Sequence, residues 1–138
     1  MAVPVITRSF ASEGIRLGDT WKVYLNASDP DGEMQVIVCT LEQPGVGVHP
    51  VGLTRVPAGA RQKLSGYVYL TTAGAQGLNN TKLGLTIQIR DQNGNYSAPV
   101  SFSLTFDPRS RPEDPPAGIF QEYDLGPIMI TLTSSSSG

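Results

Sequence analysis

Cysteine, charge and long apolar runs are all scarce in this chain of 138 residues. Cys39 is the only cysteine, which excludes an intrachain disulfide and a cysteine-cluster metal site. Charged residues make up 16% and the formal net charge is −2, so there is no basic field to attract nucleic acid. No apolar run approaches the roughly 20 residues of a membrane helix, which argues against membrane insertion.

Catalytic and targeting patterns are equally sparse. The only histidine, His49, lies in the stretch GVGVHPVG, where no nucleophile and carboxylate can be assigned to it. The glycines of this stretch do not follow the dinucleotide-binding fingerprint. The N-terminus lacks the basic and apolar regions of a signal peptide, so an export signal is expected outside this sequence. We therefore predict a protein without enzymatic activity.

The clearest pattern that is present is a strict alternation of apolar and polar residues over residues 83–106. The apolar positions of its two halves are Leu85, Ile87, Ile89, Val100, Phe102, Leu104 and Phe106. Alternation of this length is typical of half-buried strands. Asn93 and Gly94 between the halves readily adopt the positive φ angles of a tight reversal. This pattern predicts a β-hairpin with one buried face, which requires a second sheet.

Further short strands are predicted along the chain. They cover residues 3–7, 20–28, 33–41, a short segment near 51–56, residues 61–72 and the sequence IMITLT at 128–133. Residues 12–19 are predicted to form a loop. Trp21 is the best candidate for the centre of the core, and Gly66 indicates a bulge or a close contact. Strands at this spacing, with no helical period, predict an all-β sandwich.

Composition divides the chain into four parts. Residues 1–107 form the predicted β-sandwich, and residues 108–118 have the proline and charge content of an extended linker. Residues 119–133 carry an additional C-terminal strand or the start of a following module, and residues 134–138 are predicted to be disordered. The additional strand has three alternatives: it pairs with its own sandwich, belongs to a next module, or adds to another molecule.

Two motifs resemble a known class of protein. ASDPDG at residues 27–32 and RDQNGNYSAPVSFSLTF at residues 90–106 are similar to bacterial immunoglobulin-like and cadherin-like modules of large surface or secreted proteins. The resemblance covers roughly residues 3–107 and implies an immunoglobulin-like β-sandwich of about seven strands. It also implies an extracellular structural or adhesive module that spaces or presents neighbouring domains, with weak protein or glycan contacts. The paired cysteines of antibody-type domains are absent.

Calcium binding is the first alternative that the resemblance brings, although no cofactor is otherwise expected. It would place several oxygen-bearing residues at one end of the sandwich: Asp29, Asp31, Asp91, Asn93 and Asn95. Calcium takes about six to eight oxygen ligands, which carboxylates, amides and backbone carbonyls supply. The other interpretation is that these residues only shape the two turns, since DPDG fits a type I turn closely.

A tyrosine face is the second alternative. If the strands over 20–28 and 61–72 are neighbours, Tyr24, Tyr67 and Tyr69 cluster on one outer face of the sandwich. Exposed aromatic rings there would make the chain a carbohydrate-binding module or a protein-binding surface. Otherwise the tyrosines stabilise the sheet as cross-strand pairs, or the tail covers them with Ile128, Ile130 and Leu132.

Overall fold

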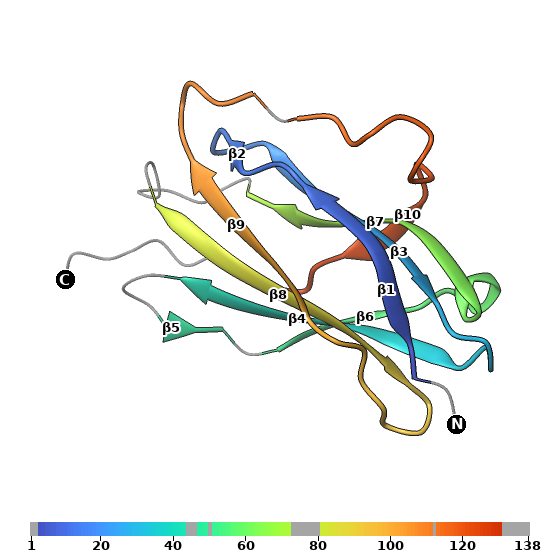
Figure 1. The fold of residues 1–138 in the computed structure, drawn as a ribbon. Coiled ribbons are helices and arrows are strands. Elements are labelled where there is room, and N and C mark those ends of the chain that lie inside the picture. Colours follow the sequence, from blue (N-terminus) through green and yellow to red (C-terminus); the bar gives the residue numbers. More distant parts are fainter. Residues whose placement is uncertain (1–2, 44–46, 50, 73–80, 112, 131–138) are drawn as a thin grey trace.

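The structure, a computed structural model, describes residues 3–43, 47–49, 51–72, 81–111 and 113–130. The protein is 57% strand and 3% helix, which confirms the all-β class. Two mixed sheets face each other, in agreement with the predicted β-sandwich (Figure 1). The described residues contain the 3-10 turn Ala58–Ala60, and they contain no helix that is long and apolar enough to cross a membrane.

The first sheet has four strands in the order β1-β3-β7-β10. Their bounds are Val5–Ala11 for β1, Thr20–Ser28 for β3, Lys63–Thr71 for β7 and Asp124–Pro127 for β10. The first three strands are antiparallel to their neighbours, whereas β10 pairs parallel with β7. A last strand from the C-terminal part of the chain therefore completes a sheet that begins with the first strand.

The second sheet has the order β2-β9-β8-β4-β5, and β6 also pairs with β4. Its strands are β2 (Gly14–Ile15), β4 (Met34–Gln43), β5 (Gly47–Val48), β6 (Gly52–Arg55), β8 (Lys82–Asp91) and β9 (Val100–Phe106). The predicted hairpin is present as β8 and β9. Its register sets Leu83 opposite Leu104 and Leu85 opposite Phe102, so the apolar residues share one face. Gly94 has a φ of +84° in the connecting turn.

The core fills the space between the sheets. Trp21 is 1% exposed, its ring meets Phe102 of the opposite sheet edge to face at 6.5 Å, and its Nε1 donates a hydrogen bond to the Ser12 carbonyl at 2.8 Å. A buried indole N–H usually needs such a partner. Burial raises the pKa of Cys39 to about 12, so this thiol stays protonated as a small core residue, as predicted.

Two local predictions need correction. The predicted loop over residues 12–19 contains the short strand β2, which pairs with the end of β9. Within the described residues, the C-terminal strand predicted at 128–133 is found instead at Asp124–Pro127, where Gly66 lets the backbone approach β7. Residues 128–130 have no regular secondary structure, and residues 131–138, which include the predicted tail, lie outside the described residues.

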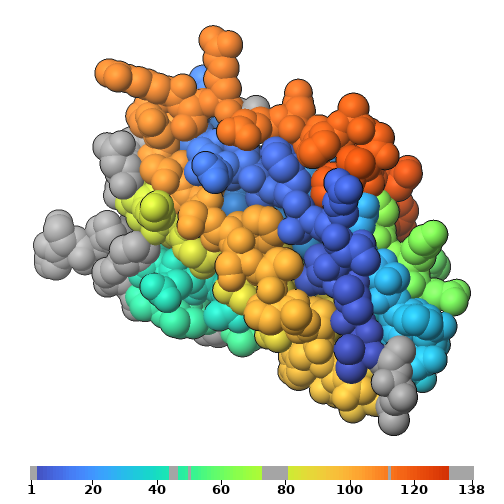
Figure 2. Space-filling model, viewed as in Figure 1, coloured from blue at the N-terminus to red at the C-terminus, as the bar shows by residue number. Residues whose placement is uncertain are grey.

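Residues 113–130, called the C-terminal strap below, lie against the outer face of the first sheet and then join this sheet as β10 (Figure 1). In Figure 2 the strap is the orange-to-red surface beside the blue N-terminal strands. Leu125 and Ile128 of the strap are 5% and 4% exposed and belong to the hydrophobic core. Gly66 makes the approach possible, since a Cβ there would lie 2.4 Å from the Tyr123 carbonyl oxygen. The close contact predicted at Gly66 is therefore present, and of the three alternatives the additional strand pairs with its own sandwich.

Candidate functional site

The five residues considered for calcium lie in two turns. Asp29 and Asp31 are in the β3–β4 turn, where one carboxylate oxygen of Asp29 accepts the Asp31 backbone N–H at 3.0 Å. Asp91, Asn93 and Asn95 are in the β8–β9 turn. There Asp91 Oδ1 accepts the backbone N–H groups of Asn93 and Asn95 at 2.9 and 2.8 Å, and its Oδ2 accepts the Asn95 side-chain amide at 3.2 Å.

The two turns adjoin at one end of the sandwich, and Glu33 connects them. The Glu33 carbonyl accepts the Gln92 N–H at 3.0 Å, and its carboxylate accepts the Asn93 side-chain amide at 2.7 Å. Sequence reasoning missed Glu33, although it directly follows the DPDG turn. The resemblance correctly implied that these turns share an end, but the bonds observed between them are those of turn stabilisation.

Both carboxylate oxygens of Asp91 accept hydrogen bonds within its own turn. Its burial by itself raises the pKa of this carboxyl, but the hydrogen bonds from Asn95 and Asn93 outweigh burial and lower the pKa below its ordinary value. Asp29 differs, because its Oδ2 is buried and has no hydrogen-bond partner among the described residues. The described residues contain no group of three or more histidine, cysteine, aspartate or glutamate side chains that could hold a metal. Calcium binding stays a prediction.

The structure brings the three tyrosines together on the outer face of the first sheet. Tyr24 and Tyr67 are directly opposite in the β3–β7 register, with ring centroids 5.5 Å apart, and the Tyr67 and Tyr69 rings are 6.4 Å apart. The carbohydrate-binding alternative required an open face, but Tyr24 is only 5% exposed, whereas Tyr67 and Tyr69 are half-buried. The neighbouring strands were predicted correctly, but the openness of the face depends on the strap.

The strap covers Tyr24 with residues other than those considered from the sequence. The Phe120 ring lies 5.6 Å from the Tyr24 ring, and the Tyr24 hydroxyl donates to the Glu122 carboxylate at 2.8 Å. Burial, and then this bond to the carboxylate, raise the pKa of Tyr24 above its ordinary value. Lys22 Nζ lies 3.8 Å from Glu122 and 4.5 Å from the centre of the Tyr67 ring. These contacts hold the strap against the sheet.

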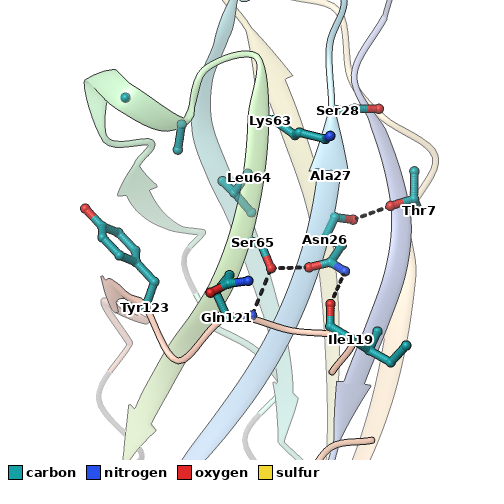
Figure 3. Close-up of a pocket in the computed structure, with 12 residues that line it drawn as sticks. Thr7, Asn26, Ala27, Ser28, Lys63, Leu64, Ser65, Ile119, Gln121 and Tyr123 are labelled. Carbon is teal, nitrogen blue, oxygen red and sulfur yellow. Dashed lines mark hydrogen bonds between the residues drawn. The ribbon is translucent and has the colours of Figure 1, made fainter. Parts of the chain in front are cut away.

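Beside the tyrosines, the strap also forms one wall of a groove of about 740 Å³ (Figure 3). Asn26 of β3 and Ser65 of β7 form its floor and are hydrogen-bonded to each other. The Asn26 amide donates to the Ile119 carbonyl at 2.8 Å, and the Gln121 N–H donates to the Ser65 hydroxyl at 3.0 Å. Sequence reasoning missed this groove, because its residues come from β1, β3, the segment 59–65 and the strap.

His49 has a local structural partner. Its Nε2 lies 2.7 Å from Oε1 of Gln43, and both side chains are buried where β4 ends. A buried amide paired with an imidazole satisfies two polar groups that would otherwise destabilise the fold. This contact and the bond from His49 N–H to the Leu41 carbonyl join the residue after β5 to the end of β4.

Comparison of the chain with protein-family models, with curated proteins and with solved structures finds no match. The likeness to immunoglobulin-like and cadherin-like modules accordingly remains a resemblance of the two turns and the last hairpin.

Proposed function

We propose that the chain is an immunoglobulin-like module of a larger exported protein, a non-catalytic unit that spaces or presents neighbouring domains at the cell surface or outside the cell. The strand order supports this proposal. The order β1-β3-β7 facing β2-β9-β8-β4 corresponds to strands A-B-E facing A′-G-F-C of immunoglobulin-like sandwiches. Within this correspondence, β10 lies next to β7 where such sandwiches carry strand D.

The observation that carries the spacing role is the direction of the chain at its two ends. β1 begins with Val5 paired to Ser28, the last residue of β3. β10 runs parallel to β7 and therefore toward Thr71, which pairs with Thr20, the first residue of β3. The chain enters at one end of β3 and leaves toward the other. The strand β3 has nine residues, so its two ends are separated by roughly 27 Å at the usual rise per residue.

The strap fixes the direction in which the chain leaves. Tyr67 N–H donates to the Tyr123 carbonyl at 2.9 Å, and Ile128 N–H donates to the Tyr69 carbonyl at 2.7 Å. Together with buried Leu125, these bonds tie the outgoing chain to β7. A neighbouring domain attached after a tied strand keeps a more constant orientation than one attached through a free linker.

Small-angle scattering of two copies joined head to tail tests the spacing role. We expect a maximum dimension close to twice that of a single copy, because β1 begins at one end of β3 and β10 runs toward the other. A matched tandem protein that carries Gly66→Ala in both copies should show a broader distance distribution, since the strap is displaced. A maximum dimension only slightly larger than that of one copy would contradict the proposal.

A further inference from the structure

We propose that the groove shown in Figure 3 binds a saccharide that carries a carboxylate, such as a uronic-acid oligomer. This inference gives the module a ligand and a site, and it does not depend on the spacing role. The volume of the groove, about 740 Å³, lies within the range of roughly 300 to 1,000 Å³ that is usual for small-molecule sites.

The charge of the groove favours an anion. Among the described lining residues, Lys63 is the only one with a charged side chain, and none of them is a carboxylate. The Lys63 side chain makes no ion pair or hydrogen bond with the described residues. Lys22, on the same face, is by contrast already engaged by Glu122 and by the Tyr67 ring. An ammonium group with no partner in the described part of a chain of net charge −2 is available to pair with a ligand carboxylate.

The neutral lining residues favour a saccharide. The Tyr123 side chain is 52% exposed at the edge of the groove, where its ring can stack against the apolar face of a sugar. The side-chain amide of Gln121 has no partner among the described residues and offers both donors and an acceptor to hydroxyl groups. Asn26 and Ser65 are bonded to each other and to the strap, so the floor between them is fixed in shape.

The floor of the groove is less suited to an extended peptide. Extended peptides are commonly held by adding a strand to a free sheet edge. β3, which forms the middle of the floor, is paired with β1 on one side and with β7 on the other. Recognition at this position therefore depends on side chains, which suits a compact ligand with many hydroxyl groups.

Titration of the whole chain, followed by amide chemical shifts, tests the proposal. The probes are trimers of galacturonate and of glucuronate, their methyl esters, which keep the hydroxyls and remove the charge, and a hexaglutamate peptide. We expect saturable shifts at Lys63, Ser65 and Gln121 with at least one acidic trimer, and at least tenfold weaker binding of its ester. The proposal is overturned if neither trimer binds, if shifts lie elsewhere, or if the ester or the peptide binds equally well.

Variants locate the site. Lys63→Gln and Tyr123→Ala should each weaken binding of the acidic trimer at least tenfold. The matched controls Lys82→Gln and Tyr96→Ala change exposed residues of the same types outside the groove and should leave affinity unchanged. Amide spectra show whether each variant is folded. If Tyr123→Ala does not fold, Lys63→Gln alone tests the site. Unchanged affinity in folded Lys63→Gln would overturn the proposal, whereas the scattering result is independent of it.

Discussion

The β8–β9 hairpin and the strand β10 are both joined to their sheets by backbone pairing, but over different lengths. β8 and β9 pair antiparallel through six successive residue pairs, from Lys82 with Thr105 to Ile87 with Val100. β10 pairs parallel with β7 through three, with a register shift between Asp124 and Gly126. Short parallel pairing contributes little by itself. The comparison shows that the hairpin is specified within its own sequence, whereas β10 depends on the surface that receives it.

Side chains compensate for the short pairing of β10. Leu125 and Ile128 are buried in the core, and full burial of such a side chain contributes about 1.5–3 kcal/mol. The hydroxyl of Tyr24 adds a hydrogen bond to Glu122. Gly66 contributes the space in which the backbone of the strap lies. The strap can therefore be disrupted without changing any residue of the hairpin.

The largest effect is expected from Gly66→Ala. The new Cβ would lie 2.4 Å from the Tyr123 carbonyl oxygen and 3.0 Å from Leu125 Cγ, so the strap must move. We expect the free energy of unfolding to fall by about 3 kcal/mol, at the upper end of the usual cost of overpacking. Denaturant unfolding followed by Trp21 fluorescence measures the change.

Gly84→Ala is the control for this change. Gly84 lies inside β8, and a Cβ there would meet only Glu42 Cβ, at 4.0 Å. Replacing a strand glycine where there is room is expected to raise stability by about 0.5–1 kcal/mol. Equal stability of Gly66→Ala and Gly84→Ala would show that the strap does not approach β7 as described.

The next largest loss of stability is expected from Leu125→Ala. This side chain is 5% exposed, and its removal should cost about 2 kcal/mol, at the lower end of the range for buried leucine because the site is near the rim of the core. Met129→Ala, four residues later and 65% exposed, should change stability by less than about 0.5 kcal/mol. Thermal unfolding of both variants compares the loss of a buried side chain of the strap with the loss of an exposed one. A small effect of Leu125→Ala would contradict the placement of Leu125 in the core.

Tyr24→Phe should have a smaller effect that depends on pH. Loss of the bond to Glu122 is expected to cost about 1 kcal/mol at neutral pH. The pKa of Tyr24 is raised in the folded protein, so above about pH 10 the unfolded state loses this proton first. Stability of the unchanged protein must then fall as pH rises, and Tyr24→Phe should show a shallower fall. Parallel curves for the two proteins between pH 9 and 11 would contradict this assignment.

Calcium is expected to have the smallest effect. Both carboxylate oxygens of Asp91 already accept hydrogen bonds within the turn, so a metal would have to displace them. We expect the same unfolding midpoint in EDTA and in millimolar calcium. A rise in the midpoint that is lost in Asp29→Ala would instead establish the cadherin-like alternative, because Asp29 retains a buried oxygen without a described partner.

The difference between the hairpin and β10 also determines how much of the structure the sequence predicts. The segment 20–28 was predicted with the bounds of β3, and the hairpin was predicted from its alternation and from Asn93 and Gly94. These patterns are local, because a strand with one buried face records that face in every second residue. The clustering of Tyr24, Tyr67 and Tyr69 on one face was predicted once the strands 20–28 and 61–72 were taken as neighbours, while their register, with Tyr24 opposite Tyr67, comes from the structure.

The strap and the groove were beyond such patterns. The residues of β10, DLGP, carry no alternation, whereas IMITLT does, and its described residues 128–130 lie after the end of the strand. The position of β10 is determined by the space above Gly66 and by the apolar sites that hold Leu125 and Ile128. These features exist only when β7 is paired with β3. The groove needs the same assembled surface.

Hydrogen exchange of the intact chain tests the docking of the strap most directly. Two backbone hydrogen bonds join the strap to β7. Tyr67 N–H of β7 donates to the Tyr123 carbonyl of the strap, and Ile128 N–H of the strap donates to the Tyr69 carbonyl of β7. We predict that both amides are protected, and that they exchange at least tenfold faster than the paired amides of β8 and β9, because short pairing opens locally. Exchange of both at the rate of an unstructured peptide would contradict the account.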